Sequence, residues 1–136
     1  AVSAVQRDRG EGEMKLTASQ LRYMMALRKL DHGDKIRCTD LAKELCVKKP
    51  SVCGMLCRLE NMGLITQDPY ADVRITEEGR TAMEEWGRRL DCLAGLLAGR
   101  LGLSRRAAGE MALTLLGNME QKSLEEALRE VSTEYF

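Results

Sequence analysis

The stretch from residue 39 to residue 62 constrains the fold most, because apolar residues recur at helical spacing on both sides of a short interval. These residues are Leu41, Ala42 and Leu45 before the interval, and Val52, Met55, Leu56 and Leu59 after it. Residues 46–49 have the length of a tight turn, and Pro50 suits the opening of the next helix, where its missing N–H loses no hydrogen bond. The pattern predicts a helix-turn-helix.

The residues that follow predict a β-hairpin. Gly63 ends the second helix, and residues 64–66 and 73–76 are typical of short strands around a turn at residues 68–72. A helix-turn-helix followed by such a hairpin is a winged helix, which usually lays its second helix in the major groove of DNA and its wing against the neighbouring backbone or minor groove. The expected fold is mainly α, with a winged helix-turn-helix DNA-binding domain over residues 16–87.

Residues 1–15 are mostly small, polar or charged, so a flexible tail is expected there. Two further helices are expected to flank the winged helix-turn-helix. Residues 17–20 have the Thr-x-x-Gln spacing of a capping box, so a helix is expected from about residue 18 to residue 31. Behind the wing, two successive glutamates suit the positive end of a helix dipole. Apolar residues at three- and four-residue steps then predict a long helix over about residues 77–100.

The remaining residues predict a helical dimerisation region over residues 88–136. Ser104 is expected to cap a fifth helix, and Ser123 begins a second capping box that starts a sixth. Such short amphipathic helices cannot easily cover one another in a monomer, so a homodimer is expected, with a closed monomeric core as the alternative. The residues expected at the dimer interface are Leu90, Leu93, Leu97, Leu101, Met111 and Leu115. Two-fold symmetry would present two recognition helices about one DNA turn apart, which matches a palindromic operator.

Charge is balanced over the whole chain but not over the helix-turn-helix. Lys and Arg number 21 and Asp and Glu number 21, so the net charge is zero and gives no general attraction to nucleic acid. The segment from residue 35 to residue 58 carries the bases Lys35, Arg37, Lys43, Lys48, Lys49 and Arg58 against the acids Asp40 and Glu44. This local excess of positive charge is what phosphate binding requires.

The residues expected to contact double-stranded DNA lie in and around the second helix of the helix-turn-helix. Long basic side chains and a hydroxyl near a helix N-terminus bind phosphate, and a glycine lets the helix backbone approach the groove closely. The main candidates are Lys48, Lys49, Ser51, Cys53, Gly54 and Arg58, with Arg37, Thr39 and Arg74 as further candidates for backbone phosphates. The alternative is a winged-helix module that binds another protein with this face.

The five cysteines are Cys38, Cys46, Cys53, Cys57 and Cys92, an odd number with no C-x-x-C pair. With no signal-like segment before them, they indicate a reducing cytoplasm. The longest uncharged runs are roughly half the ~20 residues that a membrane span requires, so none is expected. Cys53 and Cys57 share a helical face but lack the further ligands that structural zinc needs. They are expected to be space-filling thiols, with a thiol-based redox-sensing regulator as the alternative.

No catalytic constellation is present, so an enzyme is not expected. The chain has no nucleophile with a nearby histidine and no glycine-rich phosphate loop. The lone histidine, His32, falls in a predicted turn and is expected to be a solvated loop residue.

The order of these parts resembles a known family of regulators. The segments that carry the resemblance are Leu16 to Leu27, the Asp-Leu-Ala-Lys-Glu-Leu run at residues 40–45, Pro50-Ser51-Val52, residues 59–65 and residues 75–80. They resemble the metal-dependent repressors of the diphtheria toxin repressor and manganese transport regulator family. Residues 89–103 and the segment around residues 110–119 are similar to that family's dimerisation region, so the resemblance covers roughly residues 16–131.

The resemblance implies a cytoplasmic, dimeric repressor that responds to Mn²⁺ or Fe²⁺. In this family the ion is held by groups from the first helix, a histidine on the long helix and a Glu-x-x-His or Cys-x-x-Glu-His cluster on the fifth. The corresponding positions here are Ser19, Gln20 and Tyr23, then Asp91 or Cys92, then Leu113, Leu116 and Gly117. Two leucines and a glycine provide no donor atoms, so the remaining candidate ligands are Asp91, Cys92 and Glu110 and the residues themselves support no bound metal.

Overall fold

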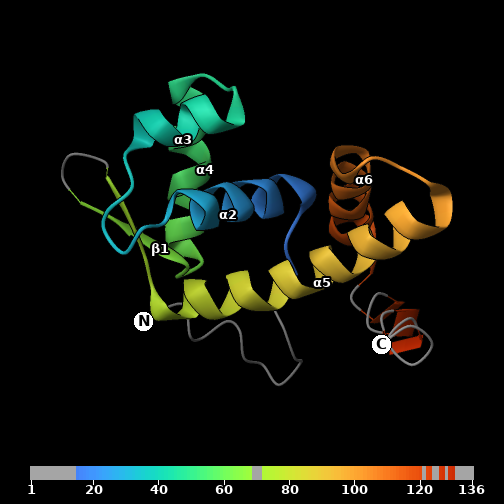
Figure 1. Cartoon of the computed structure of the whole chain (residues 1–136). Helices are drawn as coiled ribbons and strands as arrows, with labels where there is room; N and C mark the ends of the chain where they lie inside the picture. The colour runs from blue at the N-terminus through green and yellow to red at the C-terminus, as the bar shows by residue number, and fades with distance from the viewer. Residues whose placement is uncertain (1–14, 69–71, 121, 124–125, 128, 131–136) are drawn as a thin grey trace. The chain divides into compact units, whose positions relative to one another are not determined.

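The computed structural model describes residues 15–68, 72–120, 122–123, 126–127 and 129–130. Its elements are α2 (Ala18–Leu30), α3 (Cys38–Leu45), α4 (Lys49–Asn61), β1 (Ile65–Gln67), β2 (Val73–Ile75), α5 (Glu77–Leu101) and α6 (Arg105–Asn118), as Figure 1 shows. The predicted mainly α fold with a winged helix-turn-helix is confirmed. The described residues form two compact units, which are Arg22–Glu85, and Lys15–Leu21 with the described residues from Trp86 onward.

The turn of the helix-turn-helix lies where the sequence predicts it, between Leu45 and Lys49. Cys46 ends α3 in the left-handed conformation, with φ 56° and ψ 44°. The Val47 N–H then donates to the Ala42 carbonyl at 3.1 Å, which closes the turn. Lys48 is extended, with φ −82° and ψ 153°, and α4 begins after it with Pro50 in its first turn.

The wing is an antiparallel pair in which Ile65 faces Ile75 and Thr66 faces Arg74. A third segment, which the sequence did not predict, joins this pair at one residue. The Ile36 N–H donates to the Val73 carbonyl at 2.7 Å, and the Val73 N–H donates to the Ile36 carbonyl at 2.8 Å. This bridge ties the connection between α2 and α3 to the hairpin, so β2 is hydrogen-bonded on both of its edges.

A threonine and a glycine determine how α5 starts. The Thr76 hydroxyl donates to the Gly63 carbonyl at 2.7 Å and accepts from the Gly79 N–H at 2.9 Å. A Cβ atom on Gly79 would lie 2.0 Å from the Leu64 carbonyl oxygen, so no larger residue fits there without movement of the backbone. The absence of a side chain lets α5 begin against the wing.

The core of the first unit is made of the apolar faces that the sequence pattern predicts. Leu41 of α3 and Val52, Leu56 and Leu59 of α4 are buried completely. The other buried apolar residues of this unit are Tyr23, Met24, Ala26, Leu27, Ile36, Cys38, Leu64, Ile65, Val73 and Met83. Burial of these side chains is the main favourable term that holds the helix-turn-helix and the wing together.

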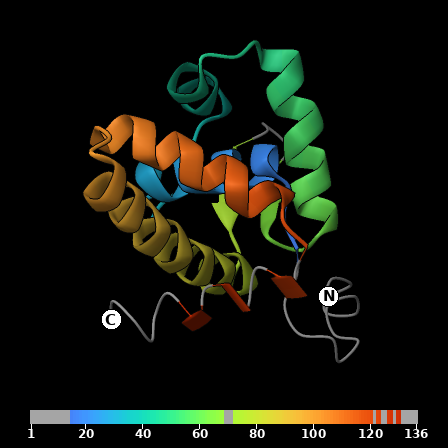
Figure 2. The same ribbon diagram turned by 90° about the vertical axis from the view of Figure 1, so that its right-hand side faces the viewer.

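The second unit contains the capping box at the start of α2, the later part of α5, and α6. The Thr17 N–H donates to the Gln20 side chain at 3.0 Å, and the Gln20 N–H donates to the Thr17 hydroxyl at 3.1 Å, which confirms the predicted box. After α5, Gly102 adopts φ 70°, and the Ser104 hydroxyl caps α6 by accepting from the Ala107 N–H at 3.1 Å. Figure 2 shows the short connection that joins α5 to α6. The predicted sixth helix from Ser123 includes residues outside the described ones.

No helix within the described ranges combines the length and the apolar character that crossing a membrane demands.

Candidate nucleic-acid interface

Helix α4 presents one buried face and one exposed face. The buried face carries the apolar residues described above. The predicted contact residues of this helix lie on the other side and are all exposed: Lys49, Ser51, Cys53, Gly54 and Arg58. A Cβ atom on Gly54 would meet no other atom within 4 Å, so the backbone at this position is open to an approaching surface.

The basic residues around α4 are available for phosphate. Within the described part of the chain, Lys48, Lys49 and Arg58 are exposed and form no ion pair. Arg37 and Thr39 are exposed at the start of α3, and Arg74 is exposed on β2. The predicted contact residues therefore share exposure to solvent, and the cations among them form no ion pair with any residue that the structure describes.

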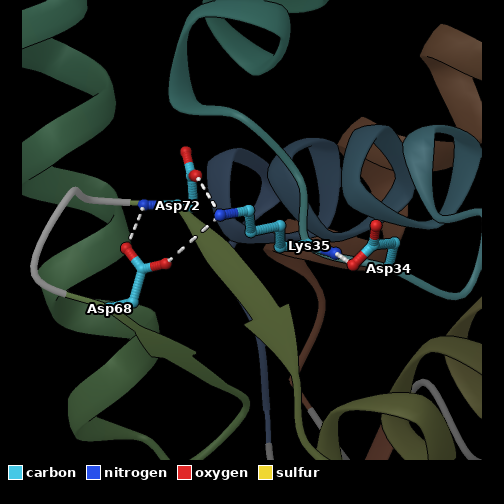
Figure 3. Close-up of polar contacts among 4 residues, drawn as sticks. All are labelled: Asp34, Lys35, Asp68 and Asp72. Carbon is cyan, nitrogen blue, oxygen red and sulfur yellow. Dashed lines mark hydrogen bonds and ion pairs between the residues drawn. The ribbon is translucent and has the colours of Figure 1, made fainter.

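Lys35 differs from the other bases of this segment because it is bound to the wing. Its Nζ atom lies 3.2 Å from Asp72 Oδ2 and 4.0 Å from Asp68 Oδ2, as Figure 3 shows. The Asp68 carboxylate also accepts from the Asp72 N–H at 3.0 Å, and Asp34 accepts from the backbone N–H of Lys35 at 2.7 Å. Lys35 thus offsets part of the negative charge of two carboxylates that flank the turn of the wing. No local sequence pattern indicates this ion pair, because its partners lie more than 30 positions away along the chain.

Beneath the exposed face of α4 lie a tyrosine and a thiol. Burial raises the pKa of Tyr23, while the nearby Arg58 guanidinium opposes that increase. Burial also raises the pKa of Cys38, and the Cys53 thiol, which shares a hydrogen bond with it, raises it further. A buried thiol at the start of α3 therefore lies near an exposed thiol on α4.

The positions at which the family resemblance expects metal ligands carry residues that do not suit a metal. Leu113 is 7% exposed and Leu116 is fully buried, so both belong to the apolar core of the second unit. Gln20 is engaged in the capping box, and Ser19 is exposed. Divalent iron and manganese need several oxygen or nitrogen donors that converge on one point, and this set does not supply them.

The remaining candidate ligands do not form a cluster. Asp91 and Glu110 are exposed, and Cys92 is half-buried with a pKa that burial raises, which disfavours the thiolate needed for ligation. Across the described residues, no group of three or more His, Cys, Asp or Glu side chains is arranged to hold a metal ion.

The residues predicted at a dimer interface differ in their exposure. Leu90 is 7% exposed and is thus covered within its own chain. Leu93 and Leu97 are half-buried. Leu101, Met111 and Leu115 are 58%, 43% and 40% exposed, which is unusual for large apolar side chains.

Known regulators resemble the chain in sequence. The family described as "Iron dependent repressor, N-terminal DNA binding domain" matches residues 15–73. An uncharacterised HTH-type transcriptional regulator of Methanocaldococcus jannaschii is 32% identical over 98 residues, which cover 70% of this chain and 76% of that protein. The HTH-type transcriptional regulator FarR of Neisseria gonorrhoeae is 35% identical over 71 residues, which cover 48% of this chain and 49% of FarR.

Solved structures share the fold. A hypothetical protein from Sulfolobus solfataricus is 18% identical with a TM-score of 0.66, over 89% of this chain and 93% of that one. The manganese regulator SloR is 20% identical with a TM-score of 0.64, and IdeR of T. acidophilum is 14% identical with a TM-score of 0.63. Each match covers 88% of this chain, which spans 54% of SloR and 56% of IdeR. From the sequence match to residues 15–73 and the identity to the M. jannaschii regulator, the chain belongs to the iron-dependent repressor family, the diphtheria toxin repressor family of winged helix-turn-helix transcriptional regulators.

Proposed function

We propose that the protein is a homodimeric repressor that binds a palindromic operator through the exposed face of α4. The single observation that carries this proposal is a set of exposed cations, Lys48, Lys49 and Arg58, around the open position Gly54; these cations form no ion pair among the described residues. The charges would neutralise phosphates, while the small residues on the same face would let the helix enter the major groove.

The exposed apolar side chains at the end of α5 and on α6 support the dimer. Met111 and Leu115 are four residues apart, so they lie on one face of α6, and both are more than a third exposed. Covering these two side chains and Leu101 with a second copy would remove apolar surface from water. A dimer would also supply the second recognition helix that a palindromic operator requires.

A charge-reversal variant tests the DNA-binding surface. Lys48→Glu with Lys49→Glu should abolish binding to an operator selected from genomic fragments, while the circular dichroism spectrum stays the same. The matched control is Arg105→Glu with Arg106→Glu, which changes the charge equally at the exposed start of α6. Normal operator binding by the Lys48/Lys49 variant, or equal loss in both variants, would contradict the proposed surface.

A second pair of variants tests the dimer. Met111→Glu with Leu115→Glu should convert the protein to a monomer in sedimentation equilibrium and weaken operator binding. Thr114→Glu, on the same helix and also exposed, is the matched control and should remain dimeric. A wild-type protein that sediments as a monomer at micromolar concentration would exclude the proposed homodimer.

The proximity of the buried Cys38 thiol to the exposed Cys53 thiol favours a second candidate function, redox-sensitive repression. A peroxide would oxidise the exposed Cys53 thiol to a sulfenic acid and release water. The Cys38 thiol would then attack that sulfur, forming a disulfide and releasing a second water molecule. Because the bond would join α3 to α4, it would change the DNA-facing helix.

Peroxide treatment followed by mass spectrometry tests this candidate. Wild-type protein should lose operator binding with the loss of two hydrogen atoms at Cys38 and Cys53, and dithiothreitol should restore both. Cys53→Ser should be insensitive, whereas Cys57→Ser, which removes the other exposed thiol of α4, should behave as wild type. Operator binding that is unaffected by peroxide would contradict redox-sensitive repression.

A further inference from the structure

A lysine side chain just before α2 forms hydrogen bonds with the end of α6. Lys15 Nζ donates to the Leu116 carbonyl at 3.1 Å and to the Gly117 carbonyl at 3.0 Å. These carbonyls belong to the last turn of α6, where backbone acceptors have no partner within the helix. A positive charge is also favoured at the C-terminal end of a helix by the helix dipole. The ammonium group therefore serves as a side-chain cap over a sequence distance of about 100 residues.

The same two segments approach each other closely at a glycine. A Cβ atom on Gly117 would lie 2.3 Å from the Ala18 nitrogen and 2.6 Å from the Ala18 Cβ atom. Only a glycine permits this approach, since the obstructing atoms are mostly backbone. Leu16 and Leu116 are both completely buried beside it. We call Lys15, Leu16, Ala18, Leu116 and Gly117 the α2–α6 joint.

This joint occupies the place at which the family resemblance expects part of a metal site. Leu116 and Gly117 stand at two of the expected ligand positions, and Ser19 and Gln20, at two others, follow Ala18 directly. A ligand side chain at position 117 would collide with Ala18. An ammonium group bonded to the neighbouring carbonyls would also repel a divalent cation.

We propose that the Lys15 ammonium takes the place of the family's regulatory metal ion at the α2–α6 joint, so that the joint is closed without metal. Because this amino group belongs to a side chain of the protein, it does not have to be taken up from solution. Operator binding, if the chain binds DNA as proposed above, would then be constitutive with respect to Mn²⁺ and Fe²⁺. The inference concerns regulation and rests on the proposed function only for its consequence at the operator.

Two measurements test the joint without DNA. Wild-type protein that has been treated with EDTA should show no rise in melting temperature when Mn²⁺, Zn²⁺ or anaerobic Fe²⁺ is added. In hydrogen exchange, Lys15→Met should increase the exchange rate of the amides at residues 16–18 and 116–118 at least tenfold. Lys122→Met, an exposed lysine of the same unit, is the matched control and should leave these amides unchanged. Gly117→Ala should loosen the same amides by steric collision, with Lys15 intact.

The outcomes separate the two proposals. A rise of several degrees in the melting temperature of the wild type with metal, or exchange in Lys15→Met equal to that of Lys122→Met, would overturn the role of Lys15. Operator affinity should change by less than twofold between EDTA and Mn²⁺, and a tenfold increase with metal would also overturn it. Absence of any sequence-selective DNA binding under all conditions would refute the proposed function. The melting and exchange results would still show whether Lys15 holds the α2–α6 joint together without metal.

Discussion

The Lys35 ammonium lies 3.2 Å from the Asp72 carboxylate, across the bridge that joins the α2–α3 connection to β2. This contact and the longer one to Asp68 place one positive charge between two negative charges that flank the turn of the wing (Figure 3). The carboxylates would repel each other, and any nearby phosphate, if the lysine were absent.

Lys35→Met should therefore lower the free energy of unfolding by about 0.5–1 kcal/mol, a modest value because the lysine side chain is 43% exposed. Urea denaturation at low salt measures this change. Lys43→Met is the control, since Lys43 is exposed on α3 and forms no ion pair among the described residues. Adding Asp68→Asn and Asp72→Asn to Lys35→Met should recover part of the loss. Equal stability of the Lys35 and Lys43 variants would show that this ion pair contributes nothing.

Cys46 is the one residue other than glycine with positive φ among the described residues, and it ends α3. Glycine adopts this conformation without the steric cost that a Cβ atom imposes. Cys46→Gly should therefore raise the free energy of unfolding by about 0.5–1 kcal/mol. Cys57→Gly, at an exposed position inside α4, is the control with the opposite expected sign, because glycine disfavours a helix interior. It should lower the free energy of unfolding by a similar amount. Chemical denaturation of both variants measures the effect, and destabilisation by Cys46→Gly would contradict this explanation.

Gly79 allows α5 to begin against the wing, because a Cβ atom there would lie 2.0 Å from the Leu64 carbonyl oxygen. Gly79→Ala should destabilise the protein by about 2–3 kcal/mol, since the backbone must move to relieve the overlap. Gly95→Ala, at an exposed position of the same helix with no atom within 4 Å of the added carbon, should be neutral or slightly stabilising. Thermal melts of the two variants at one protein concentration provide the comparison. Similar melting temperatures would mean that the approach of α5 to Leu64 is not close.

Acid should weaken the contact between Asp31 and Arg80. The Arg80 guanidinium, which is hydrogen-bonded to the carboxylate, holds the pKa of Asp31 below its ordinary value, and the Gly33 N–H adds to this effect. Because the folded protein has the lower pKa, the stabilisation is present at neutral pH and is lost as the pH falls below about 4. The free energy of unfolding of Asp31→Asn should therefore depend less on pH between 7 and 3 than that of the wild type. Glu84→Gln, an exposed acid of α5, should follow the wild type.

Local patterns were sufficient to predict most of the helices and the wing. The three- and four-residue spacing of Leu41, Leu56 and their neighbours requires two amphipathic helices, and Pro50 sets the start of the second. The capping residues Thr17 and Ser104 determine two helix starts through short-range hydrogen bonds. Each of these patterns lies within a few consecutive residues, so the helix positions can be predicted from the sequence alone.

Contacts between distant segments were not predictable in the same way. The bridge from Ile36 to Val73, the pairing of Lys35 with the wing and the bond from Lys15 to the end of α6 each join residues more than 30 positions apart. Their existence depends on how the helices and the hairpin pack, which no local pattern encodes. In the candidate interface, exposure of the α4 residues followed from helical periodicity, whereas the proximity of Cys53 to Cys38 did not.

The salt dependence of operator affinity tests the central claim most directly, because each neutralised phosphate releases a condensed counterion. Fluorescence anisotropy with a selected palindromic operator should give a linear fall of log K with log salt concentration for the wild type. Lys48→Gln, which removes one phosphate contact from each subunit of a dimer, should reduce the slope by about 2. Lys29→Gln, at an exposed lysine that instead pairs with Glu44, should leave the slope unchanged. A slope that is the same in wild type and Lys48→Gln would contradict the assignment of α4 as the DNA-binding helix.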